Sequence, residues 1–275
     1  MFTRKGVRRA LATLTLAAVA SLSAAPIANA DPTTNDTVTA TEIAAALTKA
    51  DAQNSATIAA PVASTADADS AAQTLTIDVP KDADAGVSMK STDGLPTLTV
   101  DLPNADNAAN ATRLPDGTVV YPSNDGSANA VIAAEGDSAQ MITTIANNGA
   151  PTHYEYGLKV AGGSNVVLME SGGALVNDTN GNTLRAVPAP WARDAKGATV
   201  PSHYATNNGA LTLVVDHTSG NYAYPIVADP IWIPAYLVWR IIKCGGSGAL
   251  AWITAGGFNW WQRLLISVGA CVFSL

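Results

Sequence analysis

Between residues 73 and 230, apolar side chains recur at every second position in several short runs. Leu75, Ile77 and Val79 alternate with threonine and aspartate, and a longer run of the same kind spans residues 154–160. Such alternation is typical of strands with one buried face. Turn-forming residues separate the runs, which indicates hairpins. We therefore predict a mainly β, antiparallel, sandwich-like domain over residues 73–230.

Tight turns are predicted where a turn-forming residue precedes glycine. The dipeptides are Asp93-Gly94, Asp116-Gly117 and Asn180-Gly181. Glycine accepts the positive φ that tight hairpins require.

The first 30 residues have the order of a secretory signal peptide. Four basic residues lie before residue 10, an alanine-rich apolar run follows, and Ala28-Asn29-Ala30 is a small-x-small cleavage triplet. We expect cleavage before Asp31 and a secreted, extracellular protein that can also associate with the cell envelope. The general export route and the twin-arginine route both stay open.

Residues 31–72 are rich in alanine, threonine and aspartate and contain few large side chains. Thr39 and Glu42 make a capping box for a short helix with Ile43 and Leu47 on one face. The rest of the segment has too little apolar area to offset its ordering entropy, so we predict a flexible leader. A helix docked on the body of the protein is the alternative.

Charge and aromatic residues divide the chain near residue 230. Cleavage would leave 11 basic and 22 acidic residues, a net charge of −11, and every acidic residue lies before residue 230. This acidity disfavours nucleic acid as a partner, because phosphate binding needs a basic face. Residues 231–275 contain three basic residues, five of the six tryptophans and both cysteines. The break predicts a separate C-terminal module.

A family resemblance lies within residues 157–232. It is carried by the phrases Pro190-Trp191-Ala192, Asp194-Ala195, Gly197, Val200-Pro201 and Tyr224-Pro225-Ile226-Val227-Ala228-Asp229-Pro230. They resemble a module of secreted actinobacterial proteins, in which a β-rich region ends in the last phrase and a variable C-terminal segment follows. The resemblance implies a β-rich domain and transfers no catalytic residue. By their chemistry the same residues are structural, with Trp191 as an apolar anchor and Pro225 and Pro230 ending the last strand at a domain edge.

Few residues offer catalytic or metal-binding chemistry. His153 and Glu155 share a strand face, but no further ligand stands at a recognisable spacing, so we predict a solvated face and no metal. Asp216, His217 and His203 could be combined with a serine, yet the sequence has no Gly-x-Ser-x-Gly elbow. We expect a protein that is not an enzyme and holds no cofactor, with a hydrolase as the remaining alternative.

The stretch Asp178-Thr179-Asn180-Gly181 is similar to a calcium loop. Valines stand at positions 176 and 187, where such a loop has its first carboxylate and its bidentate glutamate. We therefore predict a hairpin turn here.

Cys244 and Cys271 are expected to form a disulfide, because paired cysteines predominate in exported proteins. The bridge would close a loop of 28 residues and contribute roughly 3–4 kcal/mol by reducing the entropy of the unfolded chain. A helix can run from Ala235 to Cys244, the glycines at 245, 246 and 248 break it, and a last helix can begin at Trp260. The sequence thus predicts a cystine-closed helical hairpin.

Three interpretations of this hairpin stay open. Tryptophans and cations without acids favour an interaction with membrane or envelope. The hairpin could instead pack its apolar face on the β-domain. It could also form a transmembrane anchor over residues 244–262, although repeated glycines weaken that reading. The contact residues expected for the first interpretation are Trp239, Trp252, Trp260, Trp261, Arg240, Lys243 and Arg263.

From these patterns we predict a secreted, non-enzymatic protein whose β-rich domain carries a membrane- or envelope-interacting C-terminal hairpin. One alternative is a bacteriocin-like precursor, in which the body, with 22 acids and eight bases over residues 31–230, masks a segment of charge +3. The other is a structural or adhesive cell-envelope protein. The expected partners are membrane lipid or the cell envelope, and not nucleic acid.

Overall fold

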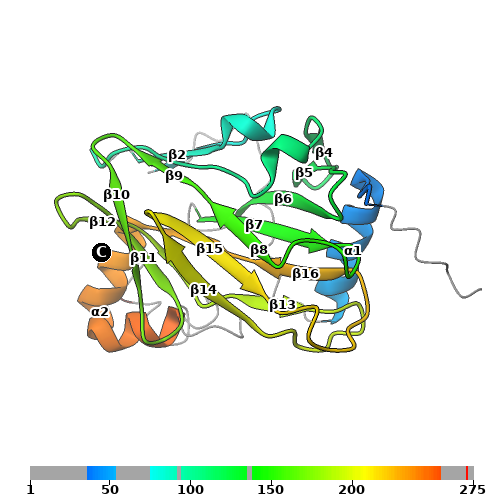
Figure 1. The fold of residues 1–275 in the computed structure, drawn as a ribbon. Coiled ribbons are helices and arrows are strands. Elements are labelled where there is room, and N and C mark those ends of the chain that lie inside the picture. The colour runs from blue at the N-terminus through cyan, green and yellow to red at the C-terminus, as the bar shows by residue number, and fades with distance from the viewer. Residues whose placement is uncertain (1–35, 54–74, 92–93, 135–137, 255–270, 272–275) are drawn as a thin grey trace, which may run out of the picture. The chain divides into compact units, whose positions relative to one another are not determined.

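The computed structural model describes residues 36–53, 75–91, 94–134, 138–254 and 271. Within them the protein is mainly β, and all of its strand pairs are antiparallel (Figure 1). This confirms the predicted fold class, a mainly β protein with a C-terminal helix.

The described strands form three sheets. The first has the order β1-β2-β3-β9, with β1 (Leu75–Asp78), β2 (Val87–Ser91), β3 (Leu98–Val100) and β9 (Leu158–Val160). The second has the order β10-β11-β12-β17-β7-β6-β5-β4, with β10 (Ser164–Leu168), β11 (Ala174–Asp178), β12 (Thr183–Val187), β17 (Ile231–Pro234), β7 (Ser138–Ile145), β6 (Ser127–Ala134), β5 (Val119–Tyr121) and β4 (Thr112–Arg113). In this sheet β16 (Ile226–Asp229) also pairs with β7, and β13 (Trp191–Arg193) pairs with β16. The third has the order β14-β15-β8, with β14 (Ser202–Asn207), β15 (Ala210–Val215) and β8 (His153–Tyr156).

The described residues form four helices. They are α1 (Ala40–Gln53), the short 3-10 helices η1 (Ala83–Ala85) and η2 (Ala105–Asn107), and α2 (Ala235–Thr254).

The main core lies where the inner faces of the three sheets meet. It contains Met89 of the first sheet, Met141 and Val176 of the second, and Tyr154 and Leu213 of the third, all of them buried. Packing of sheet faces against one another is the sandwich-like arrangement that the alternating runs predict.

Strand β7 is buried at every position, because both of its faces are covered. Met141 points into the main core, whereas its neighbour Ile142 packs with α1 on the opposite face. The capping box that begins α1 forms as predicted: the Thr39 backbone N–H donates to Glu42 Oε2 at 2.8 Å, and the Glu42 N–H donates to Thr39 Oγ1 at 3.3 Å. The predicted apolar face of α1, including Ile43, is buried. The helix is therefore docked on the β-domain, which is the alternative to a flexible leader, while residues 54–72 lie outside the described residues.

The run at 154–160 is two strands and not one. β8 and β9 belong to different sheets, and Gly157 separates them. A side chain at Gly157 would approach the Asp101 carboxylate to 2.8 Å, and the Gly157 carbonyl accepts a 2.8 Å hydrogen bond from the Asp101 N–H. This close approach allows the chain to leave one sheet for the other, and alternation alone does not reveal it.

The end of the β-rich region also differs from expectation. Pro230 does not end the sheet, because β16 and β17 on either side of it both pair with β7. The missing N–H of Pro230 is tolerated at this junction, and its carbonyl accepts a 2.9 Å hydrogen bond from the Met141 N–H. Residues 231–234, which we assign from the sequence to the C-terminal segment, form β17, and α2 begins at Ala235, where the sequence predicts a helix.

Glycine supplies positive φ at the predicted turns. The φ angles are 84° at Gly94, 95° at Gly117 and 86° at Gly181. An aspartate anchors each of the last two turns by accepting the backbone N–H two residues further along the chain. Thr118 N–H donates to Asp116 Oδ1 at 2.9 Å, and Asn180 N–H donates to Asp178 Oδ1 at 2.9 Å.

Candidate functional site

Helix α2 begins without a linker at the end of β17, and it has an apolar residue at most positions of its first three turns. Gly246 has a φ of 72° and a ψ of −177°, so the helix is kinked there. The break predicted near Gly245 and Gly246 is thus present as a kink. Gly248 does not break the helix, because helical structure continues to Thr254.

One face of α2 packs on the β-domain. Its buried side chains contact Ala186 of β12 and Ile233 of β17, and they are Leu237, Val238, Ile241 and Leu250. These contacts match the second interpretation of the C-terminal segment, in which it packs on the β-domain.

The other face of α2 presents large apolar side chains to solvent. Trp239 is 57% exposed and Ile242 is 42% exposed. Lys243 Nζ lies 4.7 Å from the centre of the Trp239 ring, and the Arg240 guanidinium lies 5.6 Å from the centre of the Tyr236 ring. Each pair joins residues four positions apart, which are neighbours on a helix surface. The exposed face therefore combines aromatic rings with positive charge.

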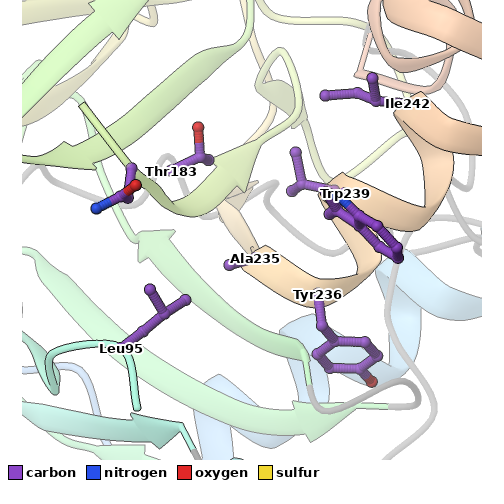
Figure 2. A pocket seen from close by; sticks show the side chains of 8 residues that line it. Leu95, Thr183, Ala235, Tyr236, Trp239 and Ile242 are labelled. Atoms are coloured by element: carbon purple, nitrogen blue, oxygen red, sulfur yellow. The ribbon is translucent and has the colours of Figure 1, made fainter. Parts of the chain in front are cut away.

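A hollow of about 460 Å³ runs beside this face. Figure 2 shows Trp239 and Ile242 of α2 on one side of the hollow and Leu95 and Thr183 on the other. The complete lining is Leu95, Asn182, Thr183, Ala235, Tyr236, Val238, Trp239 and Ile242. Sequence patterns do not predict the wall opposite α2, which consists of Leu95, Asn182 and Thr183. Only tertiary folding brings the loop before β3 and the β11–β12 turn beside α2.

The predicted disulfide is confirmed. Cys244 and Cys271 are bonded, with an S–S distance of 2.00 Å and a Cα–Cα distance of 5.8 Å. Cys244 lies on α2 two residues before the kink, so the bridge ties the far end of the chain to the helix that carries the exposed face.

The predicted contact residues fall into three groups. Trp239, Arg240 and Lys243 lie together on α2. Trp252 lies on the same helix, but its side chain is outside the description. Trp260, Trp261 and Arg263 lie outside the described residues. Within the described part of the chain, no helix is long and apolar enough to cross a membrane, and residues 255–262 of the predicted span 244–262 lie outside it.

His153 and Glu155 occupy exposed positions on the same face of β8, as predicted. His153 Nδ1 lies 2.9 Å from Thr152 Oγ1. Among the residues that the structure describes, no group of three or more potential ligands is placed to bind a metal ion.

His217 is a structural residue of the core. Its Nε2 donates to the Pro151 carbonyl at 3.1 Å, because a carbonyl can only accept, and its Nδ1 lies 2.8 Å from the Tyr224 hydroxyl oxygen. His203 lies at an exposed position of β14. In the described ranges, no hydrogen bond joins either histidine to a serine or to the Asp216 side chain.

Asp178 and Asp194 each close a turn. Asp178 accepts hydrogen bonds from the Asn182 side chain at 2.9 Å and from the backbone of Asn180 and Asn182, which lower the pKa of its carboxyl. Burial alone would raise the pKa of Asp194, but backbone hydrogen bonds, led by that from Ala223, lower it. Asp178 therefore anchors the predicted hairpin turn.

Asp229 is a buried carboxylate that lies within the family phrase at residues 224–230 but is not predicted as a site residue. Gln140 Nε2 donates to its Oδ2 at 2.7 Å, and Trp191, its neighbour across the strands, contributes side-chain and backbone hydrogen bonds. Burial raises the pKa of Asp229 from its ordinary 3.8 to about 7, and the hydrogen bonds oppose that rise. The chemical signal in the sequence is an aspartate inside the apolar run 226–233.

The fold and the site define a mainly β domain with a disulfide-tied C-terminal helix whose outer face is aromatic and cationic. Neither a family model nor a curated protein matches the sequence.

Proposed function

We propose that this is a secreted, non-enzymatic protein whose β-rich domain presents α2 and the disulfide-tied C-terminal segment to an anionic membrane or envelope surface. The observation that carries the proposal is the exposed face of α2, where Trp239 and Ile242 stand beside Lys243. Tryptophan favours the interface between lipid and water, and cations favour anionic headgroups. The segment 231–275 contains no acid that would oppose such contact.

Packing of α2 on the β-domain supports the same assignment. The face that contains Leu237 and Ile241 is buried in the protein, so it orients the helix with the Trp239 face outward. A helix held in this way can lie along a membrane surface and bury one apolar face at the depth of the headgroups.

The test is co-sedimentation of the disulfide-intact mature protein with vesicles. We expect binding to vesicles that contain phosphatidylglycerol, weaker binding to pure phosphatidylcholine, and release at high salt. Replacing Trp239→Ser together with Lys243→Gln should lower the apparent affinity about tenfold, because each Lys or Arg near an anionic surface contributes about 1 kcal/mol and apolar burial is also lost.

A matched control changes the same kinds of residue elsewhere. Val167→Ser with Lys90→Gln removes one exposed apolar side chain and one exposed cation from strands β10 and β2. This control should bind vesicles as the unmodified protein does. Equal loss in both double variants, or equal binding to both lipids, would contradict the proposal.

A bacteriocin-like precursor is the second candidate, and the charge division favours it. The body carries 22 acids and eight bases over residues 31–230, and the segment beyond carries three bases and no acid. Burial of one α2 face on the β-domain would then shield the active part until release. Intact-mass analysis of the culture medium tests this, because a disulfide-closed fragment that begins near Ala235 would support the precursor. A full-length chain retained in the wall fraction would instead favour a structural or adhesive envelope protein.

A further inference from the structure

The hollow beside α2 is an apolar trough. Ala235, Val238, Trp239 and Ile242 line it at spacings of three and four residues, so they form one stripe along the helix. At a rise of 1.5 Å per residue the stripe is about 10 Å long. Leu95 faces it from the opposite wall (Figure 2).

Asn182 and Thr183 of the lining are already engaged with the protein. Asn182 Nδ2 donates to Asp178 Oδ2, and Thr183 Oγ1 donates to Asn177 Oδ1, each at 2.9 Å. Both side chains therefore take part in the β11–β12 turn while they line the trough. The trough accordingly suits an apolar occupant better than a polar one.

Positive charge stands at one rim of the trough. Lys243 follows Ile242 in sequence and rests over the Trp239 ring, and both of those residues line the hollow. Since the segment 231–275 carries no acid, the charge at this end of the trough complements an anion.

We propose that the trough binds one acyl chain of a membrane lipid, with the anionic headgroup of that lipid beside Lys243. The inference rests on the proposed function. It assigns to the trough one specific lipid-binding site within the membrane-contacting face of α2. A volume of about 460 Å³ falls within the range of small-ligand sites. An acyl chain there would cover the apolar surface that Trp239 and Ile242 now expose to water.

The test is calorimetric titration of the full mature protein with dodecanoate below its micelle concentration. We expect saturable binding of one dodecanoate per protein. Ala235→Phe should lower the affinity at least tenfold, because the phenyl ring occupies the trough. Val167→Phe adds the same ring at an exposed position of β10 and should leave the affinity unchanged.

Two further variants keep the test decisive if Ala235→Phe does not fold. Ile242→Ser removes an exposed part of the lining and should weaken binding about threefold to tenfold, as expected for the loss of apolar burial. Lys243→Gln should weaken dodecanoate binding several-fold while leaving its stoichiometry at one.

The outcomes separate this inference from the proposed function. If phosphatidylglycerol vesicles bind but dodecanoate does not, the lipid site is wrong and the surface assignment stands. If dodecanoate binds through the trough but vesicles do not, the membrane function is wrong. Dimerisation that Ala235→Phe abolishes, without dodecanoate binding, would assign the trough to a second copy of the chain and overturn the inference.

Discussion

Asp229 has the lowest exposure of the described carboxylates, and its environment ties folding to pH. Its pKa is about 7 in the folded protein, because burial disfavours the charged form, compared with an ordinary 3.8. The folded state therefore holds this proton to a higher pH than the unfolded chain does. The stability that this proton contributes is fully present below about pH 4 and is lost as the pH rises through 7.

Asp229→Asn should remove this pH dependence. The variant should gain roughly 3 kcal/mol of unfolding free energy relative to the unmodified protein between pH 5 and pH 8, at about 1.4 kcal/mol per pH unit up to the pKa. Urea unfolding at both pH values measures it. Asp216→Asn, at an exposed position, is the control and should track the unmodified protein. A constant difference for Asp229→Asn would contradict the raised pKa.

At the scale of single elements, short sequence motifs predict the features that depend only on neighbouring residues, such as helix caps and tight turns. The capping box of Thr39 and Glu42 and the turn glycines are short-range hydrogen-bond and backbone requirements, so the sequence reveals them. The split at Gly157 and the continuation of the sheet past Pro230 depend on tertiary neighbours, namely Asp101 and Met141. Alternation and proline placement do not encode those neighbours.

The docking of α1 gives a measurable prediction. Ile43→Ala should lower the free energy of unfolding by about 2–4 kcal/mol, because it opens a cavity in the core cluster between α1 and the sheet. Thr41→Ala, on the exposed side of the same helix, should change the stability by less than about 0.5 kcal/mol. Urea unfolding measures both effects. If Ile43→Ala were as stable as the unmodified protein, α1 would behave as an undocked leader.

The kink in α2 distinguishes its glycines. Gly246 has a φ of 72°, which an alanine adopts only with strain, so Gly246→Ala should destabilise α2 by about 1–3 kcal/mol. Gly248 lies within the helix at a negative φ and with open space around it, so Gly248→Ala should stabilise it by about 0.5–1 kcal/mol. Thermal unfolding with the disulfide intact compares the two variants. If Gly246→Ala and Gly248→Ala changed the stability in the same direction, the result would contradict the kink at Gly246.

At the scale of the whole molecule, the charge division at residue 230 predicts a C-terminal module, and the sheet extends four residues into it. Trp232 of β17 is fully buried in the main core and packs edge-on against Tyr156, with ring centres 5.9 Å apart. Of the candidate site, Trp239, Arg240 and Lys243 are predicted as contact residues, because they are aromatic or cationic and the segment 231–275 has no acid. The opposite wall of the hollow is not predicted, because folding brings it there from distant parts of the sequence.

Two truncations test where the β-domain ends. A mature chain that stops at Pro234 keeps β17 and should unfold cooperatively in urea with intact near-ultraviolet circular dichroism. One that stops at Pro230 loses Trp232 and a strand from between β12 and β7, and it should fail to form that signal. Equal folding of both chains would show that β17 is dispensable.

The direct junction between β17 and α2 also has a mechanical meaning. Any surface that holds α2 pulls on a strand flanked by β7 on one side and β12 on the other. Antiparallel hydrogen bonds run perpendicular to the strands, so tension along β17 loads both ladders together and does not open them one at a time. A tether built in this way transmits force into the interior of the fold and not into a flexible connection.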